Sequence, residues 1–230
     1  MNPEKEANFA LTYYQYFFMN PADIRKVYAL HELDEKEVMS SPFEQFRLWW
    51  DDVLKSDIDE PNAMILSTAD LKGVVEARTV LLKGFDAQGF VFFTNYHSTK
   101  GRHLEENANC SLLFFWKELE RQVRITGKAS KITIDETKAY FFTRPEGSRL
   151  GAWSSPQSQI VPDKKWLEAQ FEFFSQKFSD GNIECPPHWG GYRVVANKIE
   201  FWQGRPNRMH DRIQYRKDTE GSWVIERLAP

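Results

Sequence analysis

The sequence predicts a mainly β fold of the α+β class, in which antiparallel strands form a barrel with helices around it. From residue 63 onward, short apolar segments are separated by turn residues, which is typical of hairpin-connected strands. Helical patterns occur between these strands without the regular alternation of a parallel sheet. No Gly-x-Gly-x-x-Gly follows a strand, so a doubly wound dinucleotide-binding fold is unsupported. The 230 residues, 41% apolar and 15% aromatic, contain no linker or repeat that would divide the chain.

The first 40 residues differ from the rest because they are rich in charged and aromatic residues without a clear period. We interpret residues 1–40 as an N-terminal extension with some helix and residues 41–230 as the folded domain. A helix begins after Ser41, a good N-cap residue, which is followed by Pro42 and then by Glu44. The helical period predicts one apolar face that consists of Phe43, Phe46, Trp50, Val53 and Leu54.

The remaining elements follow in order along the chain. Their predicted ranges are a hairpin at 63–68 and 74–82, a strand at 90–94, a helix at 98–107, a strand pair at 110–116 and 122–134, and a helix at 135–142 capped by Asp135. Two Pro, two Gly and several Ser predict an irregular loop over 144–158. An amphipathic helix over 162–178 has Leu167, Phe171, Phe174 and Phe178 on its inward face. Closing strands are predicted near 191–196, 198–203, 210–217 and 223–225.

Charge and cysteine content exclude several classes of function. The net charge of −3 argues against nucleic acid or an anionic membrane as a general partner, because such binding needs a basic surface. The aromatic segment at 9–18 is too short to span a bilayer and lacks the features of a signal peptide, so we expect a cytoplasmic protein. Cys110 and Cys185 are far apart and lack paired Cys/His spacing, so we expect no metal site.

Basic residues inside apolar strands are the main chemical signal. Arg78 and Lys83 flank the apolar run 79–82, and both side chains suit a phosphate ligand. Arg208 and His210 fall on one face of an extended segment and could meet one planar ligand together, with Asp211 on the other face. A Ser/His/Asp triad and a metal role for His210 are weak alternatives, because no nucleophile elbow or second ligand supports them. The remaining alternative is that these basic residues bind no ligand and are solvated charges on the surface.

Several motifs together resemble the pyridoxamine 5'-phosphate oxidase family. They are RTVLLKGF (78–85), FFTNYHSTKGRHLEEN (92–107), ERQVRITG (120–127), YFFTRPEGSRLGAW (140–153), SPQSQI (155–160), EFWQG (200–204), NRMHDR (207–212) and ERLAP (226–230). The resemblance runs in order over residues 25–230. It implies a Greek-key split barrel and a homodimer with two FMN molecules at the subunit interface. The implied reaction is the oxidation of pyridoxamine or pyridoxine 5'-phosphate to pyridoxal 5'-phosphate, with O2 reduced to H2O2 and ammonia released from the amine.

The resemblance also implies roles for individual residues. The FMN-binding residues would be Arg78, Thr79, Val80, Leu81, Leu82, Lys83, Phe93, Thr94, Thr99, Lys100, Gln122, Gln157, Ser158, Trp202 and Arg212, with the last four from the second subunit. The substrate phosphate would be held by Lys83, Tyr140, Arg144 and Ser148. The catalytic residues Arg208 and His210, with Met209 between them, would close over the substrate ring. Arg25, Lys26, Val27 and Tyr28 would match an N-terminal segment that covers the site.

Two positions depart from the family pattern. Thr99 stands where an arginine is usual, so one expected cation near the flavin phosphate is missing, and Arg149 replaces a common glutamine. Two other functions stay open at this stage. One is a non-catalytic FMN-binding split barrel, which would not need the substrate residues. The other is a related flavin oxidase of secondary metabolism, which would keep the flavin residues and change the substrate residues.

Overall fold

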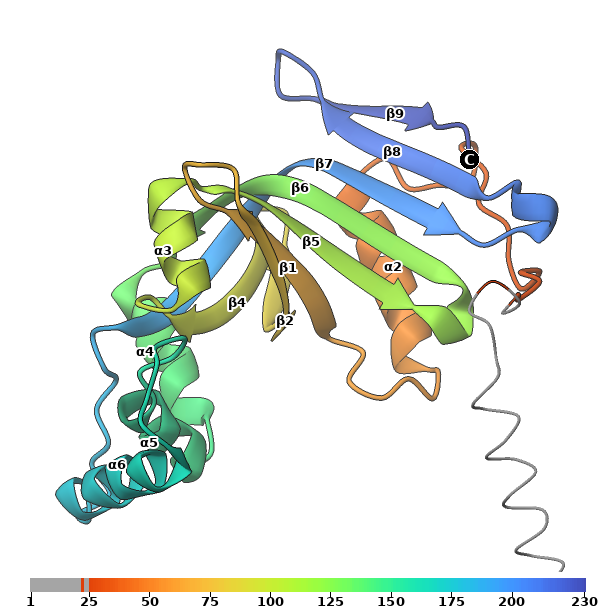
Figure 1. Cartoon of the computed structure of the whole chain (residues 1–230). Helices are drawn as coiled ribbons and strands as arrows, with labels where there is room; N and C mark the ends of the chain where they lie inside the picture. The colour runs from red at the N-terminus through yellow and green to blue at the C-terminus, as the bar shows by residue number, and fades with distance from the viewer. Residues whose placement is uncertain (1–21, 23–24) are drawn as a thin grey trace, which may run out of the picture.

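The computed structural model describes residue 22 and residues 25–230, and in this part of the chain nine strands form one curled antiparallel sheet (Figure 1). The strands are β1 (Ala63–Ala69), β2 (Val75–Leu81), β3 (Gly84–Asp86), β4 (Gly89–Asn95), β5 (Asn109–Trp116), β6 (Arg121–Lys131), β7 (Trp189–Gln203), β8 (Asp211–Lys217) and β9 (Trp223–Arg227). The helices of the same part are α2 (Pro42–Leu54), α3 (Thr99–Glu106), α4 (Ile134–Thr143), α5 (Glu146–Ser154) and α6 (Lys164–Lys177). The predicted fold class is confirmed. The helix predicted within the N-terminal extension falls mainly on residues outside the described part, and residues 25–40 contain no helix.

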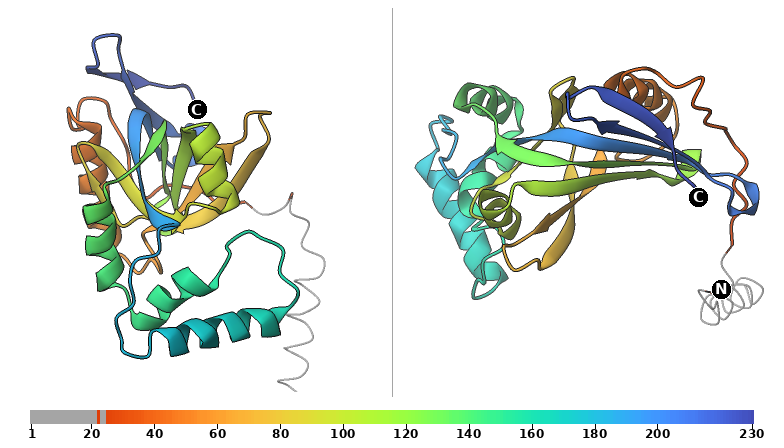
Figure 2. Two further views of the ribbon diagram at one scale, coloured as in Figure 1. Left: turned by 90° about the vertical axis from the view of Figure 1, so that its left-hand side faces the viewer. Right: turned by 90° about the horizontal axis from the view of Figure 1, so that it is seen from above.

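The long strand β7 explains why the barrel is split rather than closed. The strand order is β2-β1-β5-β6-β7-β4-β3, and β8 and β9 form a branch from β7. The first part of β7 pairs with β4, whereas residues 198–203 pair on the same edge with β8. The sheet therefore forks along β7. Figure 2 shows the result, with α4, α5 and α6 gathered at one end of the sheet, away from the β8–β9 hairpin.

The structure corrects the prediction of two separate strands at 191–196 and 198–203. They are one strand, because β6 pairs with β7 along its whole length. The register shifts between Thr126 and Gly127, so that Asn197 is an extra residue on β7 at the predicted break. Gly127 is needed at this bulge, since a Cβ there would lie 2.2 Å from the carbonyl oxygen of Val195.

Helix α2 packs its aromatic face into the main core. Phe46 is fully buried, and its ring contacts those of Phe90 and Phe114 with centroids 5.0 and 5.3 Å away. The predicted face is wrong at its edge, because Trp49 is buried while Leu54 is 59% exposed. Ser41 occupies the N-cap position but its side chain makes no capping hydrogen bond. The buried amide of Gln45 instead accepts a hydrogen bond from the backbone N–H of Met39.

The segment between β6 and β7 is more helical than predicted. The irregular loop expected over 144–158 contains helix α5, which begins after Pro145, so the two glycines in it do not prevent a helix. Helix α4 is capped by Thr133 and not by Asp135, because Thr133 forms a capping box with Glu136. Helix α6 is present, capped by Asp163, but none of its residues is fully buried. Its predicted inward face is only partly covered, and Phe171 is exposed.

Two further findings concern membrane-spanning helices and the cysteines. Among the described residues, no helix has the length and apolar content needed to cross a membrane. Both cysteines are free thiols, with Cys110 buried and Cys185 half-buried.

Candidate active site

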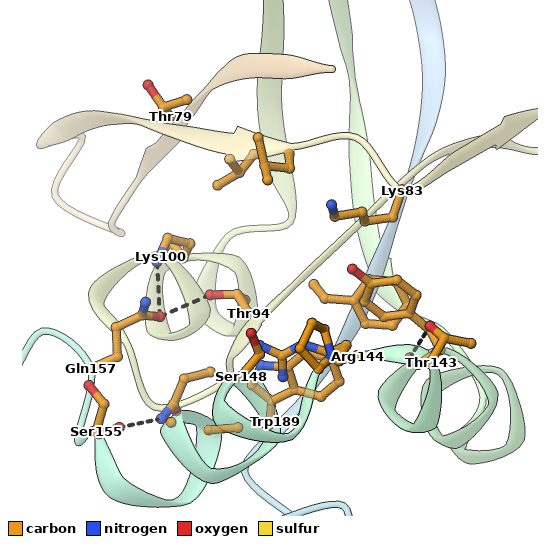
Figure 3. A pocket seen from close by; sticks show the side chains of 18 residues that line it. Thr79, Lys83, Thr94, Lys100, Thr143, Arg144, Ser148, Ser155, Gln157 and Trp189 are labelled. Carbon is orange, nitrogen blue, oxygen red and sulfur yellow. Dashed lines mark hydrogen bonds between the residues drawn. The ribbon is translucent and has the colours of Figure 1, made fainter. Parts of the chain in front are cut away.

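A pocket of about 670 Å³ opens between β2, β4 and the helices α3, α4 and α5 (Figure 3). It brings together many of the residues predicted from the sequence, although they come from four separate segments of the chain. The predicted residues that line it are Thr79, Val80, Leu81, Lys83, Phe93, Thr94, Lys100, Tyr140, Arg144, Ser148 and Gln157. Cationic groups stand at both ends of this pocket, with Lys100 at one end and Lys83 and Arg144 at the other.

Lys100 is an almost buried cation at the start of helix α3. It is 8% exposed, and its Nζ donates to Gln157 Oε1 over 3.2 Å, next to the Thr94 hydroxyl, which donates to the same oxygen over 3.1 Å. Burial, together with repulsion from Arg78, lowers the pKa of Lys100 to about 8. In the part of the chain that the structure describes, no carboxylate lies within 4 Å of this ammonium group. A buried lysine without an anionic partner is suited to bind an external anion.

Arg78 adds a second positive charge near Lys100 and is held in place by three groups. Its Nη1 donates to Thr68 Oγ1 over 2.7 Å and to the Leu66 carbonyl over 3.2 Å, and its Nη2 lies 3.1 Å from a carboxylate oxygen of Glu76. The Thr68 hydroxyl, in turn, lies 3.2 Å from Nδ1 of the buried His103. Sequence reasoning missed Thr68 and His103, because neither a threonine at the end of an apolar strand nor a single histidine on a polar helix gave a signal.

Arg144 forms the opposite end of the pocket. Its guanidinium lies over the Trp189 ring at 4.5 Å, and its buried Nη1 has no hydrogen-bond partner among the described residues. Burial lowers the pKa of Arg144, although the group stays protonated at any physiological pH. Tyr140 stacks on Phe93 at 4.0 Å beside it, and Ser148 and Lys83 lie on the same side of the pocket (Figure 3). A buried donor without a partner is costly, so this end also fits an anion. Sequence reasoning did not identify Trp189 as the platform for Arg144.

A second group of predicted residues lies at the far end of β7, and we call it the Trp202 cluster: Tyr28, Trp202 and His210. The ring centroids of Trp202 and His210 are 4.7 Å apart, and Tyr28 packs edge-on against both rings at 5.7 and 5.8 Å. Nδ1 of His210 accepts the backbone N–H of Arg205 over 3.1 Å, which leaves Nε2 to carry the proton of the neutral ring. Burial and the charge of Arg208 lower the pKa of His210, against the opposite effect of Asp211.

Arg208 and Met209 stand beside this cluster in a short 3-10 turn. Arg208 has a φ of 62°, and Met209 is 67% exposed. Gln122, Trp202 and Arg212 are register neighbours on β6, β7 and β8. Arg212 donates through Nε to the buried Glu200 over 2.8 Å. These residues therefore share the face of the sheet that α2 does not cover.

The structure does not bring the pocket and the Trp202 cluster together within one chain. Trp189 at the pocket and Trp202 are thirteen positions apart on one strand, which corresponds to roughly 40 Å. Figure 1 shows the same separation, with α4 and α5 at one end of β7 and the connection to β8 at the other.

Other predicted residues lie apart from the pocket or differ from expectation. Gln157 was expected to serve the second subunit, but it binds Lys100 and Thr94 of its own chain because α5 turns the chain back toward α3. Leu82 is a core residue. Thr99 Oγ1 accepts from Arg102 over 3.5 Å, and Ser158 has a φ of 69° in a turn. Arg149 carries a buried Nε without a partner among the described residues, which nothing in the structure explains.

Comparisons with known proteins match almost the whole chain. The family described as "Pyridoxamine 5'-phosphate oxidase" matches residues 51–178, and the "Pyridoxine 5'-phosphate oxidase C-terminal dimerisation region" matches residues 189–230. A pyridoxine/pyridoxamine 5'-phosphate oxidase of Ralstonia pickettii is 53% identical over 209 residues, which cover 91% of this chain and 98% of the relative. A pyridoxine/pyridoxamine 5'-phosphate oxidase of Rippkaea orientalis is 50% identical over 212 residues, which cover 92% of this chain and 100% of the relative.

Solved structures agree with the fold. The crystal structure of PhzG from Burkholderia lata in complex with tetrahydrophenazine-1-carboxylic acid superposes with a TM-score of 0.81 at 27% identity, covering 87% of this chain and 99% of PhzG. An FMN-binding protein related to pyridoxamine 5'-phosphate oxidase, from Nostoc punctiforme, gives a TM-score of 0.66 at 16% identity. The superposition covers 83% of this chain and 98% of the Nostoc protein. The second likeness shows the fold alone.

Proposed function

Because the chain belongs to the pyridoxamine 5'-phosphate oxidase family, we propose that it oxidises pyridoxamine or pyridoxine 5'-phosphate to pyridoxal 5'-phosphate with bound FMN. For the amine, the balanced reaction consumes O2 and water and gives the aldehyde, ammonia and H2O2. The observation that carries this proposal is the pair of separate cationic sites at the two ends of one pocket. Two phosphates, one on the flavin and one on the substrate, fit two such sites.

The residues present fit FMN at the end formed by Lys100 and Arg78. Lys100 lacks an anionic partner among the described residues, and burial, together with the charge of Arg78, lowers its pKa. A flavin phosphate would supply the missing negative charge, with Gln157 and Thr94 beside it. The bound flavin would supply a hydride acceptor for the substrate carbon, which is chemistry that no amino acid side chain supplies.

The substrate phosphate is assigned to Arg144, with Lys83, Ser148 and Tyr140. The unpartnered Nη1 of Arg144 requires an acceptor at this position, and a phosphate oxygen provides one. Trp189 fixes the plane of the guanidinium, so that the phosphate is held in a defined orientation. Fixing one end of the substrate places its reacting carbon, and this proximity is the main contribution of the pocket to the rate.

We assign the Trp202 cluster and Arg208 to the same active site, contributed by a second copy of the chain. The separation of about 40 Å along β7 prevents one chain from placing both groups on one ligand. Residues 189–230 match a dimerisation region, and the uncovered sheet face exposes Phe115, which pairs with Gln122, and Ile65 one strand further away. In this homodimer Arg208 would stack on the substrate ring. His210 would donate from Nε2, since its Nδ1 is occupied by Arg205.

A second candidate is a flavin oxidase with a different substrate, and the likeness to PhzG favours it. The ligand named for PhzG is a carboxylic acid without a phosphate, so such an enzyme would not need a full phosphate site at Arg144.

The experiment that tests the proposed function is a visible spectrum of the purified protein before and after adding pyridoxamine 5'-phosphate without oxygen. Bleaching of the flavin band supports the proposed function. A stable yellow protein contradicts it and favours a carrier or another substrate, and a colourless protein that does not bind FMN contradicts flavin chemistry altogether.

A further inference from the structure

Residues 25–35, which we call the N-terminal strap, lie against the ends of β6, β7 and β8 and carry Tyr28 into the Trp202 cluster. We propose that Glu120 is a positioning residue that holds the strap, and so keeps Tyr28 packed against His210 and Trp202 in the active site. The inference rests on the proposed function for the role of this cluster, but the docking of the strap can be measured independently.

The carboxylate of Glu120 reaches the strap with both oxygens. Oε2 accepts the backbone N–H groups of Ala29 and Leu30 over 2.8 and 3.1 Å, and Oε1 lies 3.3 Å from Nζ of Lys26. These contacts flank Tyr28 on both sides, and they join residues about ninety positions apart in the chain. The Glu120 side chain is only 3% exposed, so its hydrogen bonds to the two backbone N–H groups are largely shielded from water, whereas Lys26 is 55% exposed.

The backbone of Glu120 is itself fixed in an unusual conformation. Its φ of 55° lies in the left-handed region, which is unfavourable for a residue with a Cβ and usually taken by glycine or asparagine. Its carbonyl accepts the N–H of Gly204 over 2.7 Å and the side-chain amide of the fully buried Gln203 over 3.2 Å. A strained glutamate held this firmly indicates that its side chain has a function at this position.

Gly204 provides the surface on which Tyr28 rests. A Cβ at this position would lie 2.7 and 2.8 Å from Cγ and Cβ of Tyr28, and 3.1 Å from Cβ of Glu120. The backbone just after β7, the tyrosine and the glutamate therefore fit together at one point. This close fit is a second observation, independent of the hydrogen bonds, that the docked position of Tyr28 is built into the fold.

Other residues anchor the strap beyond Tyr28, so the effect of Glu120 can be isolated. Asp211 accepts the N–H of Leu33 over 3.1 Å, and Arg227 donates to the Leu33 carbonyl over 2.9 Å. Arg205 donates to the carbonyl of His31 over 3.2 Å. Loss of Glu120 should release residues 26–30 while Leu33 stays docked, because these anchors do not involve the glutamate.

The test compares Glu120→Ala and Glu120→Gln with Glu118→Ala, a control in the same turn whose carboxylate contacts only Lys117 among the described residues. Hydrogen exchange on the flavin-loaded protein should show lost protection at Ala29 and Leu30 in Glu120→Ala, with Leu33 unchanged. The KM for pyridoxamine 5'-phosphate should rise about tenfold with little change in kcat, and Glu120→Gln should be intermediate because one acceptor remains. Glu118→Ala should behave as wild type. Retained protection at Ala29 and Leu30, or unchanged kinetics, would overturn the proposal.

A double-mutant cycle with Tyr28→Ala separates positioning from a general effect on folding. If Glu120 acts through Tyr28, the rise in KM caused by Glu120→Gln should disappear in the Tyr28→Ala background. Additive effects of the two substitutions would contradict the proposed route. If the wild-type protein does not oxidise pyridoxamine 5'-phosphate, the proposed function fails, whereas the exchange measurement still decides whether Glu120 holds the strap.

Discussion

At the scale of single residues, the proposed function assigns two phosphates to different cations of the pocket. Lys100→Ala should weaken FMN binding, whereas Arg144→Ala should leave the flavin bound and raise the KM for the phosphorylated substrate. Each lost charge-assisted hydrogen bond contributes about 1.5–3 kcal/mol, or roughly ten- to a hundredfold in binding. Flavin content after gel filtration and steady-state kinetics measure the two effects. Purification of Arg144→Ala without flavin would contradict this division.

The lowered pKa of Lys100 predicts that flavin binding weakens in mildly alkaline solution. Without a bound anion, the lysine loses its charge as the pH rises through about 8, instead of near its ordinary value of 10.5. Between these two values the unfolded chain binds more protons at this residue, so its contribution to the stability of the flavin-free protein increases with pH. The Kd for FMN should rise about tenfold between pH 7 and 9.5. Fluorescence titration measures it, and Lys100→Met should lack this pH step.

The planar guanidinium of Arg208 predicts that lysine cannot replace it. An ammonium group keeps the charge but cannot stack on a pyridine ring. Arg208→Lys should retain its flavin spectrum and lose kcat/KM by about tenfold or more, equivalent to about 1.4 kcal/mol of transition-state stabilisation. Rates with pyridoxamine 5'-phosphate on flavin-loaded protein measure this. Wild-type efficiency would assign Arg208 to the solvated surface.

At the scale of secondary-structure elements, the sequence predicts the strands well and the chain between β6 and β7 poorly. Short apolar runs separated by turn residues identify β1, β4 and β5 to within one or two residues, whereas the short strand β3 was not predicted. The loop predicted over 144–158 is helix α5, because its glycines are tolerated where Leu150 and Ala152 pack against Trp189. Such tertiary contacts override local propensity, and a single sequence does not display them. The bulge in β7 was misread as a strand end for a similar reason, since pairing with β6 continues across it.

Two glycines test this distinction between packing and propensity. Gly127→Ala should lower the free energy of unfolding by about 2 kcal/mol, because its Cβ would overlap the Val195 carbonyl at the bulge. Gly147→Ala should raise it by about 0.5–1 kcal/mol, since no atom lies within 4 Å of the added Cβ and alanine favours the helix α5. Urea unfolding of the two variants measures both values. A stabilising Gly127→Ala would show that the close approach on β7 is wrong.

At the scale of the whole molecule, the sequence motifs predict most residues of the candidate active site but not how these residues are arranged in space. Lys83 was identified because positive charge beside an apolar strand is unusual, whereas Lys100 and Arg144 were assigned through the resemblance to the family. Glu120, Gly204 and Trp189 were missed, since their roles depend on contacts between distant segments. The length of roughly 40 Å along the strand from Trp189 to Trp202 follows only from the continuity of β7, which the sequence analysis did not predict. This length is the reason to expect that a second chain completes the active site. The position of Gln157 is not, because Gln157 contacts Lys100 and Thr94 of its own chain.

A shared active site predicts that two inactive chains can complement each other. Arg144→Ala damages the pocket and His210→Ala damages the Trp202 cluster. Each homodimer should therefore be impaired at both of its sites. In a co-expressed mixture, half of the dimers combine the two chains, and each of these has one site built from an undamaged pocket and an undamaged His210. Activity should therefore recover to about one quarter of wild type, as expected for a two-fold symmetric dimer with two sites. Light scattering on the mixture should give the mass of a dimer. If the pocket and His210 served one ligand within a single chain, the mixture would be no more active than the average of the two variants.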